Sequence, residues 1–203
     1  AIGMGDLNGD GLNEVGIAQT QFSRFSYLVN GRNSAGTASL AWNGPPTDIA
    51  RINIGDFSYE FGEDEDGEDL CNCAVGRAAF DQPIGGRGDF NGDGLPDFVQ
   101  AVRNYTLNEQ EVLVFFDAPN GPMNLAALFG PDDAPFDMPL GGVRIHSSQW
   151  FMSGETELDL SGDLNGDGFD DLVMGVGGSA GRRTIVVFGR PGSQSIDLDT
   201  MVY

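Results

Sequence analysis

One acidic segment occurs three times in the chain, and this repetition limits the possible folds more than any other feature of the sequence. The copies read GDLNGDGLNEVGIA from Gly5, GDFNGDGLPDFVQA from Gly88 and GDLNGDGFDDLVMG from Gly162. Self-similarity along a chain indicates a repeat architecture, in which each copy belongs to one supersecondary unit that packs against its neighbours.

The segments between the acidic copies predict β-strands. Hydrophobic runs at residues 27–29, 112–116 and 185–188 each lead into a turn that contains Gly or Pro. A second apolar stretch follows at residues 40–42, 125–129 and 196–201. The runs are short, β-branched and aromatic, and apolar residues at helical spacing are missing. We therefore expect an all-β fold with about four short strands in each repeat.

The landmarks divide the chain into a single array of repeats. Repeat 1 is predicted at about 1–82, repeat 2 at about 83–157 and a partial repeat 3 at about 158–203. Repeat 1 is longer because it carries an insert at about 56–82, which contains an acidic run and both cysteines.

Each acidic copy has the composition of a calcium-binding loop. Oxygen-bearing side chains occupy positions 1, 3, 5 and 9, and Gly at position 6 permits a tight turn. Hard oxygen ligands at alternating positions suit Ca²⁺, which takes about six to eight oxygen ligands. The predicted side-chain ligands of the three calcium sites are Asp6, Asn8, Asp10 and Glu14; Asp89, Asn91, Asp93 and Asp97; and Asp163, Asn165, Asp167 and Asp171.

Position 7 is expected to supply a backbone carbonyl ligand while its side chain enters the core. The residues at this position are Leu12, Leu95 and Phe169. An EF-hand would need Glu at position 12, where this chain has Ile17, Gln100 and Met174. A strand is predicted after each loop in place of the helix of an EF-hand, so EF-hands are excluded.

The charge of the chain excludes some partners. The net charge is −21, from 31 acidic residues and 10 basic residues, all of which are Arg. Such a chain repels phosphate backbones and anionic lipid surfaces, so we expect neither nucleic-acid binding nor membrane insertion. Weak calcium sites would fill in the calcium-rich extracellular medium, which favours an extracellular or cell-surface location.

The three loops resemble the FG-GAP repeat of integrin α chains and of many bacterial surface proteins. The third copy is most similar, with its loop from Gly162 followed by Val-Val-Phe-Gly at residues 186–189. In the first two copies the Phe-Gly positions are assigned to Val29-Asn30 and Phe116-Asp117. The resemblance implies a β-propeller-like array with one blade for each repeat and calcium bound between strands.

Propellers close with about four to eight blades, whereas this chain holds two complete repeats and part of a third. The open edges predict completion from elsewhere. Two alternatives remain: the chain is part of a longer propeller, or copies of the chain complete one another as a homo-oligomeric ring or filament.

The expected function is structural or adhesive: an extracellular calcium-binding propeller protein without enzymatic activity. One alternative is a module that binds a protein or glycan ligand, with Trp42 and Trp150 as candidate stacking residues. Another alternative is a part of a larger secreted hydrolase.

Several smaller features support weaker interpretations. Arg87-Gly88-Asp89 spells an adhesion tripeptide, but its Asp belongs to the second loop. A glycosylation sequon begins at Asn104. The acidic run at 63–69 is read as a solvated loop, with a further cation site as the alternative. Pairing of Cys71 and Cys73 is left open, and His146 has no support as a catalytic residue.

Overall fold

The computed structural model contains β-strands and one 3-10 turn, η2 (Leu198–Thr200), and its described part has no α-helix. The predicted all-β fold is therefore confirmed. The structure describes residues 2–18, 25–33, 49–53, 61–63, 69–71, 78–80, 85–104, 109–116, 123–124, 141–147, 157–160, 162–178 and 181–200.

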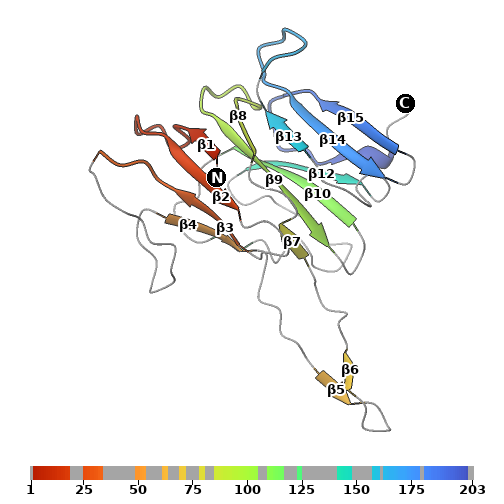
Figure 1. The fold of residues 1–203 in the computed structure, drawn as a ribbon. Coiled ribbons are helices and arrows are strands. Elements are labelled where there is room, and N and C mark those ends of the chain that lie inside the picture. The colour runs from red at the N-terminus through yellow and green to blue at the C-terminus, as the bar shows by residue number, and fades with distance from the viewer. Residues whose placement is uncertain are drawn as a thin grey trace.

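The first sheet is an antiparallel meander from the first repeat, extended by one short strand from the second (Figure 1). Hairpin pairing places Val15 opposite Val29. The added strand runs parallel to its neighbour, with Met123 beside Ile52. In spatial order the strands are β1 (Ile2–Gly5), β2 (Glu14–Ala18), β3 (Phe25–Val29), β4 (Ile49–Asn53) and β11 (Met123–Asn124).

The second sheet repeats this plan. Antiparallel pairing places Phe98 opposite Phe115 and Leu113 opposite Arg144. A parallel strand again completes the outer edge, with Ile145 beside Ile196. Its strands are β8 (Gly85–Gly88), β9 (Asp97–Asn104), β10 (Glu109–Phe115), β12 (Gly142–Ser147) and β16 (Ile196–Asp197), and β7 (Ala78–Phe80) pairs with β9 on the same side as β8.

The third sheet has three described strands, β13 (Glu157–Leu160), β14 (Leu172–Gly178) and β15 (Gly181–Val187). The insert of repeat 1 contributes the hairpin β5 (Phe61–Glu63) and β6 (Asp69–Cys71). Within the described residues this hairpin pairs with none of the other sheets.

The repeats interlock at their outer edges, which the sequence did not predict. β11 follows β10 of the second sheet in the chain but pairs with β4 of the first sheet. In the same way, β16 follows β15 of the third sheet and pairs with β12 of the second sheet. Each successive repeat thus hydrogen-bonds to the sheet before it, so neighbouring sheets are joined through the backbone.

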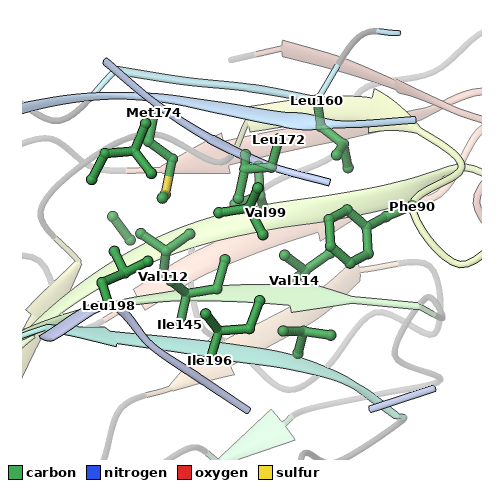
Figure 2. Packing of buried hydrophobic residues seen from close by; sticks show 14 of the residues in the cluster. Phe90, Val99, Val112, Val114, Ile145, Leu160, Leu172, Met174, Ile196 and Leu198 are labelled. Atoms are coloured by element: carbon green, nitrogen blue, oxygen red, sulfur yellow. The ribbon is translucent and has the colours of Figure 1, made fainter. Parts of the chain in front are cut away.

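The main core lies between the second and third sheets (Figure 2). Strand alternation directs Val99 and Val114 of the second sheet toward the third, and Leu172 and Met174 of the third sheet toward the second. All four side chains are buried. Phe98 occupies the opposite face of the second sheet, where its ring stacks on Phe115 at a centroid distance of 4.7 Å.

Phe90 is one of two phenylalanines in the main core, and its replacement tests the packing between the sheets. Phe90 is fully buried and its ring lies 6.4 Å from that of Phe116. We expect Phe90→Ala to lower the free energy of unfolding by about 3–5 kcal/mol, since a large aromatic leaves a cavity. Denaturant unfolding measures this loss.

The matched control is Leu164→Ala. Leu164 has the same position in the third repeat but is 62% exposed. In dilute protein its truncation should change stability by less than about 0.5 kcal/mol. Equal losses for the two variants would contradict the described packing.

Candidate metal centres

The three predicted loops each connect the first strand of a sheet to its second strand. Loop 1 (residues 6–14) joins β1 to β2, loop 2 (residues 89–97) joins β8 to β9, and loop 3 (residues 163–171) joins β13 to β14. Successive loops lie against one another, since an added Cβ at Gly92 in loop 2 would meet the Phe169 ring of loop 3. The repeats therefore place all three candidate sites in one row.

The carboxylate at position 1 organises the backbone of each loop. Asp89 Oδ1 accepts hydrogen bonds from the N–H groups of Gly92 (2.7 Å) and Asp93 (3.0 Å), and Oδ2 accepts one from Gly94 (2.8 Å). Gly94 adopts a φ of 87°, a left-handed conformation that glycine takes without strain. The loop is thus closed around one carboxylate.

Loops 1 and 3 repeat this arrangement. In loop 3 Asp163 accepts hydrogen bonds from the N–H groups of Gly166, Asp167 and Gly168, and the bond from Gly168 does most to lower the pKa of Asp163. In loop 1 Asp6 accepts from positions 5 and 6. The Asp163 carboxylate is therefore held as the anion, the form that binds a metal.

Positions 3 and 5 are also held by the backbone. Asn91 Oδ1 accepts a hydrogen bond from the N–H of Asp93 at 2.9 Å, and Asp93 Oδ1 accepts one from Leu95 at 2.8 Å. Asn91 Nδ2 donates to Asp93 Oδ2 at 2.9 Å. Loop 3 has the same three bonds. The oxygens at positions 1, 3 and 5 are therefore fixed relative to one backbone turn.

The position-9 carboxylates differ from the others because they are almost completely buried. Glu14, Asp97 and Asp171 are 0%, 0% and 1% exposed. Each accepts a hydrogen bond from the N–H of position 2 in its own loop, at 2.7, 2.7 and 2.8 Å. This acid is therefore the link between the loop and the start of the second strand.

In two repeats a glycine at the end of the third strand completes the bonding of this acid. The N–H of Gly31 donates to Glu14 at 3.2 Å, and the N–H of Gly189 donates to Asp171 at 2.9 Å. The strand register aligns Asn30-Gly31 with Phe188-Gly189. The assignment of Val29-Asn30 to the Phe-Gly position was therefore wrong by one residue.

The buried Asp97 carboxylate differs from its equivalents in the hydrogen bonding of one oxygen. Asp97 Oδ1 is buried and has no hydrogen-bond partner among the residues that the structure describes. Burial raises the pKa of Asp97 to about 8, while the N–H groups of Phe90 and Asn91 lower it. A divalent cation near Oδ1 would satisfy this atom and favour the ionised form. The residues of loop 2 thus fit a hard cation.

Carboxylates alone do not make a complete site in this structure. In the described part of the chain, no three or more Asp, Glu, His or Cys side chains form a group that could hold a metal ion. A cation in these loops would need the amide of position 3 and the carbonyl of position 7 as well, which is the mixed oxygen set that calcium accepts.

The side chains at position 7 do not lie where the sequence predicted. They were expected to enter the core, but Leu12, Leu95 and Phe169 are only partly buried. The Phe169 ring lies over Gly92 and the Leu95 side chain lies near Gly9, each a glycine at position 4 of the preceding loop. Position 7 therefore packs between loops.

Position 8, which the sequence analysis did not single out, bonds loops 2 and 3 together. Asp170 Oδ2 accepts a hydrogen bond from the N–H of Asp89 at 2.9 Å, and the N–H of Asp170 donates to the carbonyl of Asp89 at 2.9 Å. The N–H of Arg190 donates to the carbonyl of Phe90 at 2.8 Å. The spacing of the repeats does not distinguish an acid that bonds two loops, such as Asp170, from an acid that faces solvent.

The weaker candidates are only partly within the described residues. Asp89 of the adhesion tripeptide is held inside loop 2. His146 lies 3.6 Å from Glu111, a buried acid that also pairs with Arg144. Ser147 donates to Asp199 at 2.7 Å. Trp42, Trp150, Cys73, residues 64–68 of the acidic run and the rest of the Asn104 sequon lie outside the described residues.

The fold and loops define a β-propeller-type module built from blade-like sheets. Residues 160–186 match the family model of the FG-GAP repeat, so the chain carries this repeat where the resemblance was strongest. The match extends from the end of β13 through loop 3 into β15. No curated protein and no solved structure matches the chain. Among the described residues, no helix has the length and apolar character needed to cross a membrane.

Gly189 provides a test of the link between the third strand and loop 3. An added Cβ would lie 2.4 Å from the carbonyl oxygen of Asp170 and 2.7 Å from Cβ of Phe169. We expect Gly189→Ala to destabilise the protein by about 1–3 kcal/mol, because close packing leaves no room for a methyl group. Thermal unfolding measures the loss.

Gly3→Ala is the control, because an added Cβ at Gly3 would have no described atom within 4 Å. Its unfolding temperature should stay near that of the wild type. If Gly189→Ala also leaves the unfolding temperature unchanged, the described close packing of Gly189 against loop 3 is incorrect.

Proposed function

We propose that this protein is a calcium-binding structural module of the β-propeller type that works outside the cell, as a scaffold or adhesive surface and without catalysis. The observation that carries the proposal is the arrangement of loops 2 and 3, in which the side-chain oxygens of positions 1, 3 and 5 are fixed around one backbone turn. Carboxylate and amide oxygens held close together in this way are the hard ligands that calcium accepts.

The preorganisation of the loops supports the same role. Positions 1, 3 and 5 of loops 2 and 3 hold their oxygens through the same backbone bonds. Three calcium ions would reduce the large negative charge of the chain and thereby its self-repulsion. Weak binding would be sufficient in a calcium-rich medium, which is the reason for proposing a location outside the cell.

Calcium should stabilise the fold. With free calcium at about ten times the dissociation constant, each site adds about 1.4 kcal/mol, and three sites add about 4 kcal/mol. For a chain of this size this corresponds to a rise in Tm of roughly 8–16 °C. Calorimetric scans in millimolar calcium and in chelator measure the shift.

Asp89→Asn should remove the contribution of loop 2 to this shift, since it removes the charge at position 1. Asp159→Asn is the matched control, because Asp159 is an exposed acid of β13 outside the loops. An identical Tm with calcium and with chelator would refute calcium binding for the wild type.

Asp97→Asn separates a ligand from a purely structural acid. The amide keeps an oxygen for the N–H groups of Phe90 and Asn91 and loses the charge. We expect little change in Tm in chelator and a loss of about one third of the calcium shift, since one of three sites is removed. Calcium titration calorimetry should show one site fewer. The same loss of stability in both media would identify Asp97 as structural only.

A further inference from the structure

Asparagine is followed by glycine at positions 3 and 4 of all three loops. The pairs are Asn8-Gly9, Asn91-Gly92 and Asn165-Gly166. In such a pair the backbone nitrogen of glycine can attack the Cγ atom of the asparagine side chain, because glycine has no Cβ to hinder the approach. Each loop therefore contains two residues that can react with each other without an enzyme, provided that these two atoms are free to meet.

In loops 2 and 3 a hydrogen bond holds the glycine of the pair. The N–H of Gly92 donates to Asp89 Oδ1 at 2.7 Å, and the N–H of Gly166 donates to Asp163 Oδ1 at 2.6 Å. The attack requires this nitrogen to leave the carboxylate and turn its electron pair toward Cγ of the preceding side chain. The hydrogen bond therefore opposes the reaction in both loops.

The asparagine side chains of loops 2 and 3 are held at both polar atoms. Asn91 Oδ1 accepts a hydrogen bond from the N–H of Asp93 at 2.9 Å, and Asn91 Nδ2 donates to Asp93 Oδ2 at 2.9 Å. Asn165 and Asp167 make the same two bonds, at 2.9 and 2.8 Å. Rotation of either side chain toward the following nitrogen would break both bonds.

Loop 1 lacks two of these three restraints. Asn8 Oδ1 accepts a hydrogen bond from the N–H of Asp10 at 3.0 Å. Among the residues that the structure describes, however, neither Asn8 Nδ2 nor the N–H of Gly9 has a hydrogen-bond partner. The rest of the turn is intact, because Asp6 still accepts hydrogen bonds from the N–H groups of Asp10 and Gly11. The loosening is therefore confined to the Asn-Gly pair.

Gly9 is an exception among the glycines of the loops. At positions 4 and 6, each of the other five donates its N–H to the position-1 carboxylate: Gly11, Gly92, Gly94, Gly166 and Gly168. The pair Asn30-Gly31 is also restrained, since the N–H of Gly31 donates to Glu14. The Asn-Gly pairs at residues 43–44 and 120–121 lie outside the described residues. Asn8 and Gly9 are both exposed, so water reaches them.

We propose that Asn8 is a site of spontaneous deamidation, which modifies loop 1 before loops 2 and 3. The nitrogen of Gly9 forms a bond to Cγ of Asn8, the Cγ–Nδ2 bond breaks, and ammonia leaves with the proton of the Gly9 N–H. Water then opens the succinimide at one of its two carbonyl carbons, which gives aspartate or isoaspartate at residue 8. One water is consumed, one ammonia is released, and nothing is oxidised or reduced.

Either product changes loop 1. Aspartate adds a negative charge between Asp6 and Asp10. Isoaspartate carries the chain through its side-chain carbons and lengthens the backbone by one atom, so the hydrogen bonds from positions 5 and 6 to Asp6 cannot keep their geometry. The deamidation itself does not depend on calcium, although both products alter position 3 of a candidate calcium site.

The test keeps the full chain in warm, mildly alkaline buffer with chelator and follows each Asn-Gly pair by peptide mass spectrometry. Asn165 is the matched internal control, because residues 163–168 and residues 6–11 both read Asp-Leu-Asn-Gly-Asp-Gly. We expect Asn8 to deamidate about tenfold faster than Asn165 and Asn91, since two hydrogen bonds of ordinary strength separate them. Isoaspartate among the products identifies the succinimide route, because direct hydrolysis of the amide gives aspartate alone.

Asp93→Ser tests the cause of the difference in loop 2. Serine keeps an oxygen for the N–H of Leu95 and removes the oxygen that accepts a hydrogen bond from Asn91 Nδ2. Asn91 should then react several-fold faster. Asn165 in the same molecule should keep its rate, which shows that the fold is intact.

Equal rates at Asn8 and Asn165 would overturn the proposal, because both side chains are exposed and have the same sequence around them. Aspartate without isoaspartate at residue 8 would overturn the succinimide route. An unchanged rate at Asn91 in Asp93→Ser would show that the hydrogen bonds do not protect the pair. Calcium binding is judged separately, from the Tm shift of fresh protein, so either proposal can fail while the other holds.

Discussion

The buried carboxylate at position 9 is the interaction on which the rest of the structure depends. Asp171 accepts hydrogen bonds from the N–H groups of Leu164 and Gly189, and so ties the loop and the end of the third strand to the start of the second. Glu14 does the same in the first sheet. Because burying a carboxylate is costly without such partners, the loop and the strand ends must keep one arrangement.

This arrangement makes the loops part of the packing between sheets. Phe90, at position 2 of its loop, lies in the main core, while Phe169 and Asp170 contact the preceding loop. A cation bound in one loop would therefore hold a contact between two sheets as well as one turn of backbone. For this reason calcium binding and the stability of the array are expected to be coupled.

The sequence predicted those features that depend on local pattern. The oxygen-bearing side chains at alternating positions identified the loops, and the β-branched runs identified the strands. It did not predict that β11 and β16 pair with the preceding sheet, because such pairing joins residues far apart in the chain. Nor did it predict that the N–H of Gly31, rather than that of Asn30, donates a hydrogen bond to Glu14 of the first loop. A shift of one residue appears only in the strand register.

The two internal junctions between neighbouring sheets differ at position 8 of the later loop. At the first junction position 8 is Pro96, which has no N–H to donate and packs near Gly5. At the second junction Asp170 uses both its side chain and its N–H. The second junction therefore adds polar specificity to the apolar contact between its sheets, whereas the first relies on packing at this position.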